Sequence, residues 1–205
     1  MDIQLNFINN SNDVNNSEIV IFQKNVATGF DELPVAWLVI RYCGQGDNHP
    51  FTWPVDVQVG ASDGYGNFTP HLDAQSGQMF KMVFTSSGDQ LVPAGSGTSS
   101  KEVQVLNSLP KGAINAYIFK AGKLLAVKTS IAPQQRAIFE FKPTLWIGVT
   151  SQQVVQGQVM NSAIISDITT ELNLLGIASA DIVMRGGGSG PDATPFAFSL
   201  ENIVM

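Results

Sequence analysis

The chain has 205 residues, of which 44% are hydrophobic and only 14% charged, and its net charge is −6. This length and apolar content suffice to bury a core, and we expect a single domain over residues 1–205. Lys and Arg form no run anywhere in the sequence. Since nucleic-acid binding needs a basic surface, the composition excludes a nucleic-acid partner, and it disfavours anionic membrane surfaces for the same reason.

The first ten residues, MDIQLNFINN, lack the basic start and apolar stretch of a signal peptide. Apolar runs stay well below the roughly 18 residues that a transmembrane helix needs. We therefore expect a soluble chain that is synthesised in the cytoplasm. Export without a cleaved signal peptide is an alternative, so the sequence does not predict the compartment in which the protein acts. Cys43 is the only cysteine, which excludes an intrachain disulfide, and we expect it to be a buried hydrophobe.

The first half of the chain shows short strand patterns separated by polar loops. Apolar and polar residues alternate over 3–8, and the runs EIVIFQ and AWLVIRYC are continuously apolar and rich in β-branched residues. Alternation predicts half-buried strands and continuous runs predict buried ones. A further strand is expected over 51–60, between the loops CGQGDNHP and ASDGYGNFTP.

The second half continues the same pattern. Strands are expected at MVF, KEVQVLN, 136–141, LWIGV and 196–204, and AYIFKAGKLLAV predicts a hairpin that turns at Ala121-Gly122. TSSGDQLVPAGSGTSS is expected to be a loop, and residues 162–176 fit both a helix and a strand. The first and last strands both have the composition of interior strands. About a dozen short, mainly antiparallel strands with little helix predict an all-β fold, a single-domain β-sandwich or jelly roll.

The sequence RGGGSG at 185–190 raises the possibility of a phosphate-binding loop. A dinucleotide fingerprint would have glycine where Pro191 stands, and a P-loop would end in Gly-Lys-Ser/Thr. A strand pattern follows instead of a helix, so the loop lacks a helix N-terminus to bind an anion. We expect the loop to turn the chain; the alternative is a ligand contact with Arg185 at its edge.

The segment VGASDGYG contains the pattern G-x-S-x-G of a nucleophile elbow, but a loop follows it where the elbow needs a helix. A tight turn is the preferred interpretation. Tyr65 is flanked by glycines and expected to be exposed, with Asp63 and Asn67 close by as hydrogen-bonding groups. A stacking aromatic with such partners suits a glycan, so Asp63, Tyr65, Asn67 and Arg185 are the candidate ligand-binding residues; a protein interface is the alternative for Tyr65.

Two His/Asp pairs have mirrored spacing: Asp47 with His49, and His71 with Asp73. On extended backbone, residues i and i+2 point to the same side, so the four could bind Zn²⁺ or Mn²⁺ together; plain loop histidines are the alternative. The loop INNSNDVNNSE is rich in oxygen ligands for Ca²⁺, though it lacks the EF-hand glycine; an Asn-rich turn is the alternative.

The sequence offers no paired nucleophile and base and no cofactor loop. We expect a non-enzymatic binding protein that recognises a glycan, a cell surface or a partner protein through its Gly/Asn/Asp-rich loops, with a surface-acting toxin or effector subunit as a variant. The low charge favours self-association into a homo-oligomer. The alternative is a metal-dependent enzyme on a jelly-roll scaffold that uses the His/Asp set.

Overall fold

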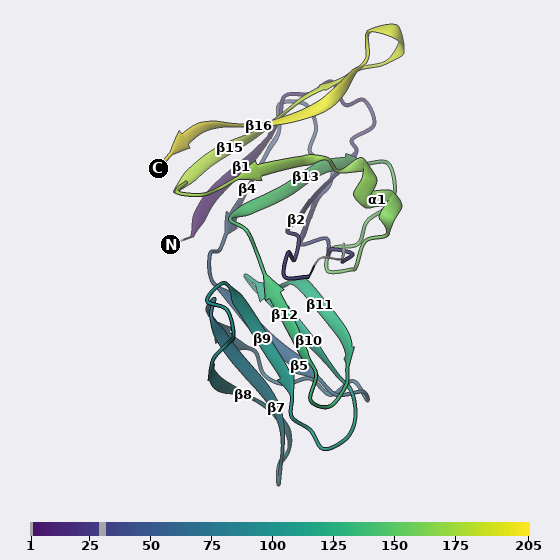
Figure 1. The fold of residues 1–205 in the computed structure, drawn as a ribbon. Coiled ribbons are helices and arrows are strands. Elements are labelled where there is room, and N and C mark those ends of the chain that lie inside the picture. Colours follow the sequence, from purple (N-terminus) through teal and green to yellow (C-terminus); the bar gives the residue numbers. More distant parts are fainter. Residues whose placement is uncertain (1, 29–31) are drawn as a thin grey trace. The chain divides into compact units, whose positions relative to one another are not determined.

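The structure is a computed structural model that describes residues 2–28 and 32–205. Over these residues the chain forms sixteen strands, one short α-helix and one short 3-10 helix, shown in Figure 1. The strands form four four-stranded sheets in which most neighbours are antiparallel. The predicted all-β fold with little helix is confirmed.

The chain divides into two compact units, each with two of the four sheets. Unit 1 comprises Met1–Lys24, Leu33–Val55 and Pro143–Met205, and unit 2 comprises Asn25–Glu32 and Asp56–Lys142. The single domain expected over 1–205 stays a prediction, which a single melting transition of both units would test.

Unit 1 contains one sheet with the order β16-β15-β1-β4 and a second with the order β14-β13-β2-β3. The strands of the first sheet are β1 (Ile3–Asn9), β4 (Asn48–Trp53), β15 (Ser179–Gly187) and β16 (Thr194–Val204). Those of the second are β2 (Glu18–Phe22), β3 (Leu38–Ile40), β13 (Thr144–Thr150) and β14 (Thr170–Asn173).

Strand β1 occupies an interior position in its sheet, between antiparallel β4 and parallel β15. Its alternation places Ile3, Leu5 and Phe7 in the core of unit 1 and leaves the residues between them on the outer face. The interior position predicted for the first strand is confirmed. The same prediction for the last strand is wrong, because β16 lies at the edge of this sheet and pairs with β15 alone.

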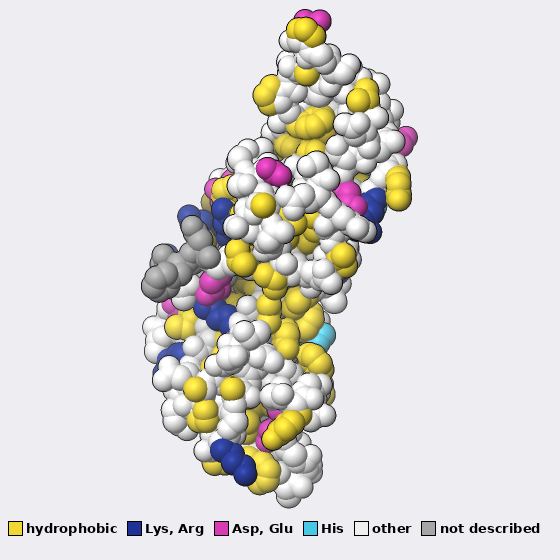
Figure 2. Space-filling model, turned by 90° about the vertical axis from the view of Figure 1, so that its right-hand side faces the viewer, with side chains coloured by type: hydrophobic (Ala, Val, Ile, Leu, Met, Phe, Trp, Pro, Cys, Tyr) yellow, Lys and Arg dark blue, Asp and Glu magenta, His cyan; other side chains and the backbone are white. Residues whose placement is uncertain are grey.

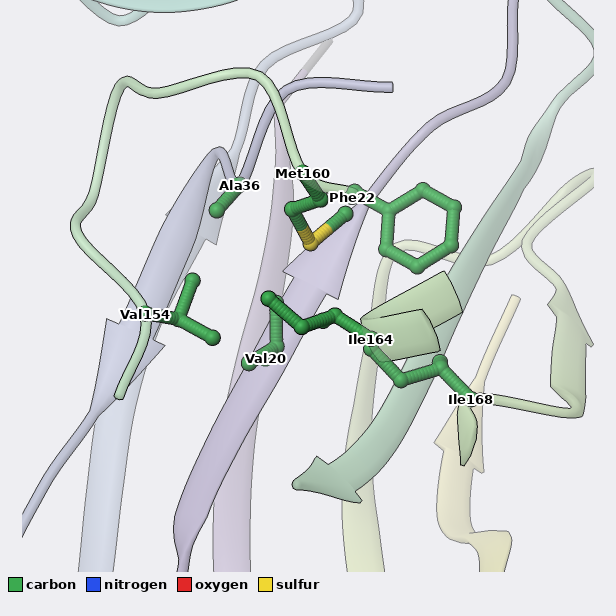
Figure 3. Close-up of a cluster of buried hydrophobic side chains, with 7 residues drawn as sticks. All are labelled: Val20, Phe22, Ala36, Val154, Met160, Ile164 and Ile168. Atoms are coloured by element: carbon green, nitrogen blue, oxygen red, sulfur yellow. The ribbon is translucent and has the colours of Figure 1, made fainter. Parts of the chain in front are cut away.

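Strand β2, in the second sheet of unit 1, is buried on both faces. Val20 and Phe22 point away from the face of Ile19 and Ile21, and the short helix α1 (Ser162–Asp167) packs over them in the cluster drawn in Figure 3. The cluster comprises Val20, Phe22, Ala36, Val154, Met160, Ile164 and Ile168. Burial on both faces explains why the β2 run is continuously apolar.

The ambiguous segment 162–176 contains both elements that its pattern allowed. The Asn161 side chain accepts a hydrogen bond from the backbone N–H of Ile164 and so caps α1 at its N-terminus. The helix ends at Asp167, the backbone is extended at Ile168, and β14 follows at Thr170.

Unit 2 contains sheets with the orders β11-β10-β5-β6 and β12-β9-β7-β8. The strands of the first are β5 (Val57–Ser62), β6 (Leu72–Ala74), β10 (Ile114–Lys120) and β11 (Lys123–Ile131). Those of the second are β7 (Gln78–Thr85), β8 (Gly88–Ser96), β9 (Glu102–Asn107) and β12 (Arg136–Glu140). In β10, residues Ile114, Ala116 and Ile118 are fully buried and alternate with half-buried residues on the outer face.

Four local predictions differ from the structure. The single strand expected over 51–60 is divided, because β4 ends at Trp53 in unit 1 and β5 begins at Val57 in unit 2. The loop expected before residue 51 contains the start of β4 at Asn48, and the loop expected over 85–100 contains β8, paired with β7. Cys43 is half-buried instead of buried, and its burial, with the nearby Asp47 charge, raises the pKa of its thiol. Over the described residues, none of the helices has the length and apolarity to cross a membrane.

Candidate functional site

Four aromatic side chains contact one another in sequence along the outer face of the sheet β11-β10-β5-β6; we call them the aromatic row. Phe68 lies against Tyr117 with ring centroids 5.4 Å apart, and Tyr117 lies 6.2 Å from Phe119. Phe119 in turn stacks on His71 at 3.9 Å with an angle of 21° between the planes. Phe68 is 67% exposed, so the row ends in solvent.

The alternation of β10 creates the centre of this row. Because Ile114, Ala116 and Ile118 point into the core of unit 2, Tyr117 and Phe119 must point outward. Strand β5 lies beside β10 with Gly60 directly opposite Tyr117. A Cβ atom on Gly60 would lie 3.2 Å from His71 Cδ2 and 3.3 Å from Phe119 Cε2. Glycine therefore provides the space in which these two rings stack over the strand.

Hydroxyl, amide and carboxylate groups lie beside the aromatic row. Ser62 Oγ lies 3.1 Å from Tyr117 Oη and accepts a hydrogen bond of 3.2 Å from Asn115 Nδ2. On the other side, Gln58 Nε2 donates to Asp73 Oδ1 at 3.1 Å. The partners of the buried Ser62 are thus a phenol and an amide, which is a supporting network and not a serine–histidine pair.

The loop of the predicted ligand-binding residues leads directly into the aromatic row. The Asp63 carboxylate accepts hydrogen bonds from the backbone N–H groups of Tyr65 and Asn67 and from Asn67 Nδ2. These bonds, first the one from the Asn67 side chain, lower the pKa of Asp63. Asp63 and Asn67 thus hold the loop closed, while Tyr65 is 95% exposed. Phe68, the next residue after Asn67, forms an isolated bridge with Ser62.

Arg185 lies in unit 1 on β15, whereas Asp63, Tyr65 and Asn67 lie in unit 2. Its guanidinium forms a salt bridge with Glu201 on β16 and donates to Ser199. The pairing raises the pKa of Arg185 and lowers that of Glu201. Arg185 is thus held by the neighbouring strand.

The first half of the RGGGSG sequence, 185–187, belongs to β15. The second half turns the chain into β16 through the short 3-10 helix η1 (Gly190–Asp192), so the prediction of a turn is confirmed there.

The four residues of the predicted metal set are divided between the units. Asp47 and His49 belong to unit 1, where Asp47 Oδ2 accepts a hydrogen bond from the backbone N–H of Gly44. His71 and Asp73 belong to unit 2 and contact Phe119 and Gln58. Across residues 2–28 and 32–205, no three His, Cys, Asp or Glu side chains are grouped so that they could hold a metal ion.

The Asn-rich loop considered for Ca²⁺ is organised by Asp13. Its carboxylate accepts hydrogen bonds from the backbone N–H groups of Asn15 and Ser17 and from the Ser17 hydroxyl. Both carboxylate oxygens are therefore used inside the loop, as in an Asx turn.

These features define an all-β protein of two units, one of which has an aromatic row on an exposed sheet face. The family model described as RhiA matches residues 2–176, and the chain therefore belongs to the RhiA family. The matched residues extend from β1 through β14 and include the whole aromatic row, while β15 and β16 lie beyond them. No curated protein and no solved structure matched the chain.

Proposed function

We propose that the chain is a non-enzymatic glycan-binding protein and that the aromatic row in unit 2 is its binding surface. The observation that carries this proposal is the unbroken contact from Phe68 through Tyr117 and Phe119 to His71 on the outer face of a sheet. Aromatic rings offer rigid apolar faces against which the C–H face of a sugar ring packs. Several rings in a line suit an oligosaccharide better than a single sugar.

The polar groups beside the row supply the other half of sugar recognition. Sugar hydroxyls need both donors and acceptors, and binding sites commonly combine apolar surface with a few placed polar groups. Asn115 and Gln58 provide amides, Tyr117 a phenol and Asp73 a carboxylate. Tyr65, at the tip of the adjoining loop, adds a further exposed ring at the Phe68 end.

The distribution of charge favours a neutral glycan over a sulfated or phosphorylated one. The chain has 11 Lys and Arg residues against 17 Asp and Glu. Figure 2 shows, on the face it presents, that charged side chains occupy small separate patches among uncharged and hydrophobic ones. An anionic ligand would need concentrated positive charge, whereas a neutral sugar needs hydrogen bonds and apolar contact.

Titration calorimetry of the full chain with a set of neutral oligosaccharides tests the proposal. Tyr117→Ala removes the centre of the row and should weaken binding of the best ligand about tenfold. Phe84→Ala is the matched control, because Phe84 is a 70% exposed aromatic of the same unit outside the row. The proposal would be refuted if both variants lost the same amount of oligosaccharide affinity, or if the parent chain bound no neutral oligosaccharide.

Self-association into a homo-oligomer stays a prediction. Several copies of the row on one assembly would strengthen binding to a glycan-covered surface through multivalency. Light scattering coupled to size exclusion measures the oligomeric state directly.

A further inference from the structure

A groove of about 370 Å³ opens on the outer face of the sheet β16-β15-β1-β4 in unit 1. Because side chains alternate along each strand, all four strands contribute outward-facing polar groups to this groove. Its polar lining consists of Gln4, Asn6, Thr52, Ser179, Asp181 and Asn202. Five of these six residues are amides or hydroxyls, one is a carboxylate, and the lining includes no Lys, Arg or His. The volume falls within the range of small-molecule pockets, about 300–1,000 Å³.

Hydrogen bonds across the strands hold the polar groups of the groove in place. Asp181 Oδ1 accepts from Asn6 Nδ2 at 3.3 Å, and Asp181 Oδ2 accepts from Asn202 Nδ2 at 2.7 Å. Thr52 Oγ1 donates to Gln4 Oε1 at 3.0 Å. The two amide groups that face Asp181 therefore use their nitrogen atoms there, which leaves their oxygen atoms for other donors.

One of these oxygens has no donor. Asn6 Oδ1 is buried and accepts no hydrogen bond from any residue in the described part of the chain. Rotating the amide would not satisfy it, because the oxygen would then face the acceptor Asp181 Oδ1. Buried acceptors are nearly always satisfied, so an unsatisfied one in a residue that lines a groove indicates a donor supplied from outside the chain. Because the oxygen has almost no accessible surface in the free chain, a ligand reaches it through a small rotation of the Asn6 side chain.

We propose that this groove is a second sugar-binding site, which takes a single neutral sugar whose hydroxyl donates to Asn6 Oδ1. Fixed amides and hydroxyls match a ligand that carries many hydroxyl groups. An anion is disfavoured because the lining holds a carboxylate and no cationic side chain. A divalent cation is disfavoured because one carboxylate, already bound to two amides, is a poor ligand set.

The groove lies in unit 1 and the aromatic row in unit 2, so the two sites are built from different residues. The inference rests on the groove and its unsatisfied acceptor and does not depend on the row. If both sites bind, one chain is bivalent, with a site for an oligosaccharide and another for a single sugar.

Titration of the isotope-labelled full chain with free neutral monosaccharides, followed by NMR, tests the site. Binding should shift the side-chain amide signals of Asn6 and Asn202 and leave the amide of Asn107, which is buried in unit 2 and belongs to neither site, unchanged. Asn6→Ala should weaken the affinity for the shifting sugar about tenfold. Phe84→Ala, outside both the groove and the aromatic row, should leave this affinity as it is.

A second variant keeps the test valid if Asn6→Ala fails to fold. Asn202 has a positive φ of 50°, so Asn202→Gly removes its side chain while keeping a backbone conformation that glycine adopts readily. It should also weaken binding with an unchanged circular dichroism spectrum. The site is refuted if no neutral monosaccharide shifts the Asn6 and Asn202 signals, which would leave an ordered water as the donor to Asn6. It is also refuted if both folded variants bind as the parent does.

Discussion

The imidazole of His71 lies nearly parallel to the ring of Phe119, with centroids 3.9 Å apart, and atoms of both rings lie within contact distance of a Cβ built on Gly60. His71 precedes β6 and Phe119 is in β10, with β5 hydrogen-bonded to both strands between them. The stack therefore bridges the middle strand, and it does so only because that strand has no side chain at residue 60.

Gly60→Ala tests this relationship. The added Cβ would lie 3.2 Å from His71 Cδ2, which is tighter than ordinary contact, so the rings must shift. Because His71 is exposed, a shift of its ring displaces no buried group, so the stability should fall by only about 1 kcal/mol or less, while oligosaccharide affinity falls several-fold. Gly64→Ala is the control, because its Cβ would meet its nearest neighbour, Ala113 O, at an ordinary 3.7 Å. Equal glycan affinities of the two variants in calorimetry would contradict a binding role for the stack.

Gly186→Ala should strongly destabilise unit 1. Gly186 has a φ of 94°, and a Cβ there would lie 2.1 Å from the carbonyl oxygen of Pro195, so the two strands would have to separate. We expect a loss of about 3 kcal/mol or more. Gly190→Ala, at a φ of 72° with no atom within 4 Å of its Cβ, should cost about 1 kcal/mol.

Urea unfolding followed by tryptophan fluorescence measures this pair of variants, because all three tryptophans lie in unit 1. Similar midpoints for Gly186→Ala and Gly190→Ala would show that the β15–β16 connection tolerates a side chain at either position. The glycines of RGGGSG would then have a role other than steric fit.

Lys120 should make the stability depend on pH. Burial lowers the pKa of Lys120 to about 8 in the folded chain from an ordinary 10.5. The unfolded chain therefore binds the proton more tightly, and the folded state is disfavoured by this group at pH values below about 8. Stability should rise as the pH increases from about 8 towards 10.5, by about 3 kcal/mol from this group.

Urea titrations at several pH values check this prediction with Lys120→Met, in which the rise should shrink. Burial also lowers the pKa of Lys123, and that smaller contribution stays in both proteins. Lys111→Met, at an exposed position, is the control and should keep the full rise. A Lys120→Met variant with the parent's pH dependence would show that Lys120 is not the responsible group.

Asn107→Ala should destabilise unit 2 by about 3 kcal/mol. Asn107 is fully buried, and its Nδ2 donates to the carbonyl oxygens of Gly112 and Ile131 while its Oδ1 accepts from the Leu109 N–H. Alanine leaves all three backbone groups without these bonds. Asn67→Ala removes an exposed amide that donates to Asp63 Oδ2, so water replaces this bond and the cost should stay below about 1 kcal/mol. Thermal unfolding monitored by circular dichroism compares the two, and equal midpoints would contradict the role of burial.

The sequence predicts those parts of the fold that local rules determine. The hairpin turn is an example: Ala121 and Gly122 have φ values of 51° and 71°, as a two-residue turn between strands requires. The alternation at 3–8 likewise determines which residues of β1 enter the core. In both cases the decisive contacts lie within a few residues of each other.

Features that depend on strand neighbours could not be predicted from the single sequence. β8 has a loop-like composition, with Pro93 and Gly95, and is a strand because it lies at a sheet edge, where such residues are tolerated. The aromatic row requires that Tyr117 lie opposite Gly60, a register between segments more than fifty residues apart. The hairpin that contains Tyr117 and Phe119 is predicted from local sequence, but the strand that lies beside them is not.

The separation of β1 from its parallel partner β15 has a consequence for synthesis on the ribosome. Asn6 and Asp181, which bond across these strands, are 175 positions apart, and the long stretch Asp56–Lys142 of unit 2 lies between them. Since chains fold progressively as they emerge, unit 2 has all of its strands while β1 has only one of its two neighbours, β4. A strand with an open edge invites wrong pairing with other nascent chains. The edge of β1 that later pairs with β15 therefore stays open until β15 has left the exit tunnel, and slowing translation beyond residue 142 should increase aggregation.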